Sequence, residues 1–195
     1  MRLSDLVGAI TAHDVVVVAI AALAFQAAAL LALGRQLLGA RGEFKLWEDD
    51  VSSPGLSQQL TDWYSFTHIV HGVLFYFLVW FAMPELSVPH RFLIALAVEV
   101  GWEILENTPF AIRHYRKQPP AKDYKGDSIA NSLMDTLAMM LGFLLAWRLP
   151  VVAVIAISIL LEIGLALIIR DNFTLNVINF VHPFDFIRRW QNGAS

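Results

Sequence analysis

Three glutamates interrupt one of the long apolar stretches of this sequence, residues 92–112. A charged group at the centre of a membrane helix costs about 2.5–3.5 kcal/mol, whereas each Leu, Ile, Val or Phe contributes only about 0.3–0.6 kcal/mol in return. At 3.6 residues per turn, Glu99, Glu103 and Glu106 fall within an arc of about 60°. They therefore form one acidic stripe that needs hydrogen-bonding partners, protons or a bound cation.

Two other apolar stretches carry polar residues at helical spacing. Asp127, Asn131 and Asp135 follow each other at i, i+4 and i+8, and His68 and His71 are separated by three residues, so each set lies on one helix face. Gly126-Asp127-Ser128 is also typical of a helix N-cap, so capping is an equal alternative for Asp127. Asn131 and Asp135 lie too deep for capping, which favours a site.

These side chains together are a nitrogen and oxygen ligand set, and the sequence has no cysteine. Such a set suits Zn, Mn, Fe or Mg, and a spare carboxylate beside the metal is a candidate general base. The alternative is a structural network of hydrogen bonds across the helices. We predict metal ligands among His68, His71, Glu99, Glu103, Glu106, Asp127, Asn131 and Asp135, with Glu103, Glu106 and Asp135 as candidate catalytic groups.

A basic stretch follows the acidic helix. Arg113, Arg116 and Lys125 lie between the two acidic stripes and are candidates for binding the phosphate of a lipid headgroup. The alternative, which we favour, is that these residues fix the orientation of the chain in the membrane.

The elements that carry these residues are predicted from hydropathy. The chain is 57% hydrophobic and 16% charged, well above the apolar content of a soluble domain. Its net charge of -3 argues against a nucleic-acid partner. We predict an all-α, polytopic transmembrane bundle, one integral membrane domain from 1 to 195, with helices over 15–34, 63–83, 92–112, 127–147 and 150–169, followed by a cytoplasmic or interfacial tail over 170–195.

The distribution of basic residues predicts the orientation of this bundle. If the five helices alternate in direction, one side receives only Arg2, Arg91 and Arg148, and the other side receives the remaining eleven Lys and Arg. The positive-inside rule then places the N-terminus outside and the C-terminus in the cytoplasm of a bacterial inner membrane. In this arrangement, the predicted ligands all fall in the cytoplasmic half of the bilayer.

A set of short motifs lies at residues 57–58, 62–64, 68–72, 102–107, 124–128, 131–132, 170–172 and 175–176. Through these motifs the sequence resembles a family of uncharacterised bacterial inner-membrane proteins. The resemblance covers most of the chain beyond the first helix, and it implies membrane location without implying an activity. A fainter similarity is to VanZ-like membrane proteins, through the acidic helix and the Asp-x-x-x-Asn helix.

The sequence leaves three functional hypotheses open. The first is a metal-dependent hydrolase or transferase acting on a membrane lipid or lipid-linked headgroup. The second is an ion- or proton-coupled transporter, in which the same acids would titrate along a pathway. The third is a structural or assembly factor. A relay needs polar groups across the whole membrane, and the outward halves of the predicted helices have almost none, which favours the enzyme.

Overall fold

The computed structural model describes residues 8–39, 45–117 and 123–193, and helices dominate this part of the chain. Two short parallel strands, β1 (Trp47–Glu48) and β2 (Thr61–Asp62), pair Trp47 with Thr61 in the loop before the second long helix. The helices are α2 (Ala12–Ala32), α3 (Ser65–Ala82), α4 (Val88–Glu106), α5 (Pro109–Tyr115), α6 (Ile129–Arg148), α7 (Val151–Ile169), α8 (Phe173–Val181) and α9 (Asp185–Gln191). The fold is therefore all-α, as predicted.

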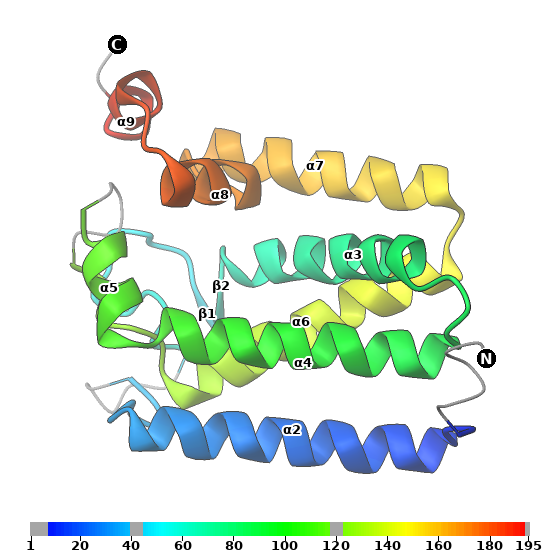
Figure 1. The fold of residues 1–195 in the computed structure, drawn as a ribbon. Coiled ribbons are helices and arrows are strands. Elements are labelled where there is room, and N and C mark those ends of the chain that lie inside the picture. Colours follow the sequence, from blue (N-terminus) through cyan, green and yellow to red (C-terminus); the bar gives the residue numbers. More distant parts are fainter. Residues whose placement is uncertain (1–7, 40–44, 118–122, 194–195) are drawn as a thin grey trace.

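The five long helices lie roughly side by side as a bundle (Figure 1). Helix α4 is central and packs against α2, α3 and α6, while α7 packs on the opposite side against α3 and α6. The short elements α5, α8, α9, β1 and β2 gather at one end of the bundle (Figure 1). That end is also where α3 and α6 begin and α4 finishes, so it collects the polar residues of all three.

The predicted helix over 92–112 is wrong at its C-terminal end, because the chain forms two helices there. Helix α4 ends at Glu106, and α5 begins at Pro109 after Thr108, whose side chain accepts a hydrogen bond from the backbone N–H of Ala111. Proline is favoured in the first turn of a helix, where its missing N–H costs nothing. The Thr-Pro pair therefore starts a new helix and turns the chain.

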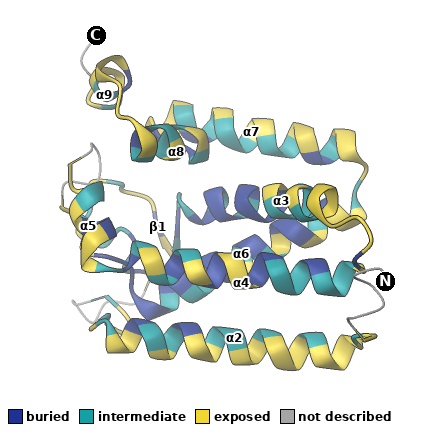
Figure 2. Ribbon diagram, in the orientation of Figure 1, coloured by how far each residue is buried: buried dark blue, intermediate teal, exposed yellow. Residues whose placement is uncertain are grey.

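Within the described part of the chain, four helices have the length and apolar composition to cross a membrane: α2, α3, α6 and α7. Helix α4 is as long as these, but it carries Arg91 and the three glutamates and is not in that group. Its carboxylates at Glu99 and Glu103 are buried inside the bundle, at 0% and 1% exposure. Figure 2 shows long exposed stretches on α2 and α7, where the side chains are mostly apolar.

Helices α3 and α6 approach each other closely through two glycines. A Cβ atom at Gly72 would lie 1.9 Å from the carbonyl oxygen of Met139, and one at Gly142 would lie 2.0 Å from that of Ile69. Small residues let helix backbones pack this tightly in membrane proteins. The contact fixes His68 and His71 of α3 relative to Asp135 of α6.

The apolar core lies beside this contact, further from the polar end. Ala95, Leu96 and Val100 of α4 pack there against Met139 and Phe143 of α6, and all five are buried. The bundle thus has a dry half that sets the helix spacing and a polar half that holds the candidate site.

Candidate metal centre at one end of the bundle

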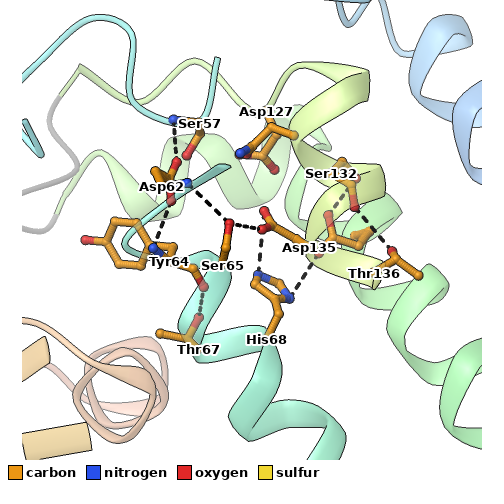
Figure 3. A network of polar contacts seen from close by, with 12 residues as sticks. Ser57, Asp62, Tyr64, Ser65, Thr67, His68, Asp127, Ser132, Asp135 and Thr136 are labelled. Carbon is orange, nitrogen blue, oxygen red and sulfur yellow. Dashed lines mark hydrogen bonds and ion pairs between the residues drawn. The ribbon is translucent and has the colours of Figure 1, made fainter. Parts of the chain in front are cut away.

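Three helices bring five of the eight predicted ligands together, while Glu106, Asp127 and Asn131 belong to neither group of donors that could share an ion. His68 and His71 come from the first turns of α3, Glu99 and Glu103 from the second half of α4, and Asp135 from the first half of α6. All five are buried, with exposures of 8% or less. Figure 3 shows His68 pointing from α3 toward Asp135, with Ser65 of the same helix beside that carboxylate and Asp62 next to Ser65.

The two histidines share one carboxylate. The Nδ1 atom of His68 lies 2.6 Å from Oε1 of Glu99, and the Nδ1 atom of His71 lies 3.3 Å from Oε2 of the same residue. One donor atom from each of these residues fits within 4.8 Å of the others, which is close enough for a shared metal ion. His68, His71 and Glu99 therefore form a compact set of two imidazoles and one carboxylate.

A second set also contains His68. Its partners are Glu103, whose Oε1 atom lies 3.3 Å from the Nδ1 atom of His68, and Asp135, whose Oδ2 atom lies 4.0 Å from its Nε2 atom. Donor atoms of these three residues likewise fit within 4.8 Å. The Ser65 hydroxyl donates to Asp135 at 2.6 Å, so this carboxylate is held in place from α3.

Glu103 is oriented by a chain of hydrogen bonds that reaches α2. The Ser132 hydroxyl donates to Oε2 of Glu103 at 2.6 Å, and the Gln26 amide donates to the Ser132 hydroxyl at 2.8 Å. Thr136 donates to the other end of the Gln26 amide at 2.9 Å. Outer partners of this kind fix a ligating carboxylate in metal sites.

Two buried polar groups in this region lack hydrogen-bond partners within the described chain. They are the Oε1 atom of Glu103, which lies within ion-pair distance of the Nδ1 atom of His68 at 3.3 Å, and the whole amide of Asn131, which is 1% exposed. Most buried polar side chains in proteins are hydrogen-bonded, so an orphaned group calls for an unseen ion, water or ligand. Both groups belong to the predicted ligand set.

Asp127 is held by hydrogen bonds from side chains of the neighbouring loops. The helix cap is Ser128, which accepts from the N–H of Asn131, so the capping alternative for Asp127 is wrong. Asp127 instead accepts from the Asn107 amide at 2.7 Å and from the Tyr124 hydroxyl at 2.9 Å. Burial raises its pKa above the ordinary value for an aspartate. Tyr124 also donates to Glu106 at 3.2 Å.

A cavity of about 640 Å³ opens onto this cluster. Of the predicted site residues, His68, His71, Glu106, Asp127 and Asp135 line it, whereas Glu99, Glu103 and Asn131 lie behind its wall. The volume is in the range of pockets that hold small molecules. Among the candidate catalytic groups, Glu106 and Asp135 therefore face the space where a substrate would sit, and Glu103 does not.

The three basic candidates are placed differently from one another. Lys125 lines the cavity and is its only Lys or Arg among the described residues. Arg116 is exposed and donates through Nε to the backbone oxygen of Tyr124 at 2.6 Å, and Arg113 is exposed without lining the cavity. Residues 118–122 of the basic stretch lie outside the described part of the chain.

Two aspartates just outside the long helices belong to the same region and were missed from the sequence. Asp62 accepts from the backbone N–H groups of Ser57 and Tyr64 at 2.9 and 2.8 Å, and burial raises its pKa to about 6. Asp171 accepts from the hydroxyl of Tyr64 at 2.9 Å, and burial raises its pKa to about 7. Neither interrupts an apolar stretch, so hydropathy gave no signal for them.

The charge of the cluster is unbalanced. Ion pairs of Glu99, Glu103 and Asp135 within the described chain are all made with His68 or His71, and none with Lys or Arg. Several carboxylates with so few fixed cations are stable in a buried place only when protons or a bound cation neutralise them. A divalent cation is one way to meet that need.

The fold and the cluster define the class: an all-α protein of apolar helices with a buried histidine and carboxylate site at one end. Comparison with known sequences gives the family. Residues 30–193 match the family described as "Protein of unknown function (DUF2585)", and the chain belongs to it.

Relatives from several bacteria carry the name UPF0314 protein. The one from Rhizobium meliloti strain 1021 is 49% identical over 162 residues, covering 83% of this chain and 82% of the relative. The one from Sphingopyxis alaskensis is 44% identical over 177 residues, covering 91% and 94%. No solved structure matches. The similarity to VanZ-like proteins has no support in these matches.

Proposed function

We propose that this protein is a membrane enzyme that uses a divalent metal ion, held by His68, His71 and Glu99, to act on a lipid or lipid-linked headgroup. The observation that carries the proposal is the convergence of these buried donors from α3 and α4 beside a cavity. A bound divalent ion polarises a phosphoryl or carbonyl oxygen, or activates a water molecule. The reaction class is accordingly hydrolysis or group transfer.

Two features favour this donor set over the set of His68, Glu103 and Asp135. Two imidazoles with one glutamate are an established ligand set of catalytic zinc, and two histidines with one carboxylate also hold non-haem iron. In addition, both Nδ1 atoms face the two oxygens of the same carboxylate, at 2.6 and 3.3 Å. Glu106 and Asp135, which face the cavity, are then free to act as general base or acid.

The charge of the cavity wall restricts the headgroup. A phosphate entering this site meets the carboxylates of Glu106, Asp127 and Asp135, and Lys125 is the only Lys or Arg side chain among the described lining residues. An anionic headgroup would therefore bind only after the metal ion has reversed the local charge. Lys125 would contribute a second positive contact; the exposed Arg113 and Arg116 would serve the orientation of the chain.

For the membrane, we propose five crossings, with the N-terminus outside, the C-terminus in the cytoplasm and the site in the cytoplasmic half. Helix α4 would cross the membrane in addition to the four more apolar helices, because its Glu99 and Glu103 point into the bundle and leave lipid contact to residues such as Val98. A charged residue is tolerated in a spanning helix when it faces the bundle interior.

Metal analysis of the purified protein tests the proposal. We expect one Zn, Mn or Fe ion per chain in protein purified in detergent without chelator, measured by plasma mass spectrometry. His68→Ala, His71→Ala and Glu99→Gln should each lose the ion. Asp135→Asn should keep it, because Asp135 belongs only to the second set.

Matched controls come from polar residues away from the cluster. His182→Ala and Glu85→Ala change exposed side chains outside the site and should leave the metal content unchanged. Retention of the ion in His71→Ala with loss in Asp135→Asn would move the metal to the second set. Protein that takes up no divalent ion, even when incubated with an excess, would contradict the proposal.

A transporter remains the alternative, and the distribution of buried charge weighs against it. Arg91, near the start of α4, is the only buried charged side chain among the described residues at the end of the bundle opposite the cluster. Its guanidinium donates to the backbone oxygen of Pro84 at 2.6 Å. A proton or ion path needs polar groups along its length, so the concentration of acids at one end fits a site better than a path.

A further inference from the structure

The cavity is polar at one end and apolar along the rest of its wall. From the histidines it continues past Phe75 of α3 and between Gly101 and Trp102 of α4 on one side and Phe173 and Val177 of α8 on the other. Polar atoms contribute the smaller part of the lining surface. A ligand that fits this space has a polar group at one end and a hydrocarbon part at the other.

The apolar end of the cavity lies between two helices that meet at few points. Rings bridge the gap at Trp102 and Phe180, whose centroids are 6.1 Å apart, while His71 and Phe173 lie 4.8 Å apart deeper in the cavity. The cavity is partly open to the outside of the protein, and its lining includes exposed residues of both α4 and α8.

The rim of this opening is apolar. Val98 and Leu105 of α4 are 49% and 45% exposed, and Val177 and Val181 of α8 are 46% and 79% exposed. Gly101, between the two α4 residues, has open space where a side chain would be, with no atom within 4 Å of a Cβ built there. A glycine in the middle of a helix costs stability. Because Gly101 has free space beside it, close helix packing does not explain this glycine, whereas passage of a ligand does.

We infer that the opening between α4 and α8 is a side entrance through which one hydrocarbon chain of a membrane lipid enters. Gly101, which has no side chain, forms the thinnest part of its wall. This inference rests on the proposed function and assigns its substrate class: an amphiphile with a hydrocarbon chain, bound with its headgroup at the histidine and carboxylate cluster. The rim residues meet the hydrocarbon of the bilayer, while Phe75 and Phe173 contact the chain inside.

Photo-crosslinking from a lipid tail tests the entrance. The probe is phosphatidylglycerol with a diazirine in one acyl chain, in phosphatidylcholine vesicles that contain the full-length protein, with adducts mapped by mass spectrometry. We expect adducts on the cavity residues Phe75 and Phe173, and also on exposed residues of α7 such as Ile155 and Ile159, which report ordinary lipid contact.

Gly101→Leu should lower the cavity adducts at least tenfold and leave the α7 adducts unchanged. Gly101→Ala, with a smaller side chain, should give an intermediate decrease. The matched control is Gly164→Leu on α7, where a Cβ also meets no atom within 4 Å and which does not line this cavity. This variant should behave like the wild type at both places.

The outcomes separate the entrance from the metal site. Cavity adducts that persist in a metal-free His68→Gln variant and vanish in Gly101→Leu support the entrance, even if metal analysis contradicts the proposed enzyme. Adducts confined to α7 in the wild type, or cavity adducts of equal yield in Gly101→Leu and wild type, would overturn the inference. Unchanged α7 adducts in each variant show that the protein is folded and inserted.

Discussion

Asn131 and Asn107 are two fully buried amides of this site with opposite surroundings. Asn107 donates to Asp127 at 2.7 Å and to the backbone oxygen of Glu103 at 3.0 Å, and it accepts from the N–H of Asp127 at 2.7 Å. Asn131 has no partner at either amide atom within the described chain. Substitution of the two residues therefore tests whether each amide stabilises the fold or is placed to bind a ligand.

We expect Asn107→Leu to lower the free energy of unfolding by about 1–3 kcal/mol, because the buried Asp127 loses both hydrogen bonds that it makes with the Asn107 amide. Asn131→Leu should leave the metal-free protein unchanged or stabilise it by about 1 kcal/mol, since it removes an unsatisfied amide. Thermal unfolding in detergent, with chelator present, measures both. Destabilisation by Asn131→Leu equal to that by Asn107→Leu would show that Asn131 has a structural partner.

Asp171 gives a pH dependence whose direction follows from its burial. Because its pKa in the folded protein is raised to about 7 from 3.8, the folded state binds more protons than the unfolded state between these values. Stability from this group is therefore present at low pH and lost as the pH rises toward 7, with a slope of at most about 1.4 kcal/mol per pH unit.

The variant Asp171→Asn removes this titration. We expect the stability of the wild type relative to Asp171→Asn to fall from pH 4 to pH 7 and to level off above, as measured by thermal unfolding across that range. A relative stability that rises with pH would mean that the three donors to Asp171, on Tyr64, Asn172 and Gln191, favour the charged form more than burial opposes it.

At the residue scale, the sequence predicted those site residues whose presence in an apolar helix is costly. His68, Glu99, Glu103 and Asp135 each interrupt a hydrophobic stretch, and helical spacing placed them on common faces. Asp62 and Asp171 could not be found in this way, because they precede α3 and follow α7 in segments that are polar in any case. Only the fold shows their contacts: Asp62 donates through its N–H to Ser65, which holds Asp135, and Asp171 accepts from Tyr64.

At the scale of elements, the close contact of α3 with α6 is the feature of the bundle that leaves the least room for larger side chains. Gly72→Ala places a methyl group against the backbone of Met139, and Gly142→Ala places one against that of Ile69. We expect each to lower the free energy of unfolding by about 1–3 kcal/mol or more, because a backbone atom cannot move aside as a side chain does. Both should also weaken metal binding, because moving α3 away from α6 displaces His68 and His71 relative to Glu99 of α4.

Control substitutions for this contact lie in the same bundle. Gly101→Ala and Gly164→Ala meet open space, so they should be neutral or should stabilise their helices by about 0.5–1 kcal/mol. Denaturant titration in mixed micelles, with metal content measured on the same samples, distinguishes the four variants. Equal stability of Gly72→Ala and Gly101→Ala would show that α3 and α6 pack less tightly than the structure has them.

The long helices were predictable because each combines an apolar run with clear end signals, such as Pro84 after α3 and Pro150 before α7. The break between α4 and α5 has a local signal, Thr108-Pro109, but the apolar residues on both sides hid it. No local feature of the sequence indicated where α8 would pack. The cytoplasmic or interfacial position of the tail after Arg170 stays a prediction, and the structure adds that α8 of this tail forms a wall of the cavity through Phe173, Val177 and Phe180.

At the scale of the whole molecule, the status of α4 decides on which sides of the membrane the termini lie. Helices α2, α3, α6 and α7 qualify as spans by composition, and four crossings would put both termini on the same side. Five crossings, with α4 included, put them on opposite sides, as the places of the start of α2 and of α9 at opposite ends of the bundle suggest (Figure 1). The location of the termini is thus a direct test of whether a helix with three glutamates spans the membrane.

The chain suits this test because it has no cysteine, so a single introduced thiol is the only labelling site. We expect Gly8→Cys to react with a membrane-impermeant maleimide in intact spheroplasts, and Asn192→Cys to react only after the membrane is permeabilised. Both positions are exposed. The physical reason is the excess of Lys and Arg on the side of the C-terminus, which holds that side in the cytoplasm. Reaction of both thiols in intact spheroplasts, or of neither, would place the termini on one side and remove α4 from the spans. The buried cluster would then lie outside the membrane, and the entrance beside Gly101 would not face the hydrocarbon of the bilayer.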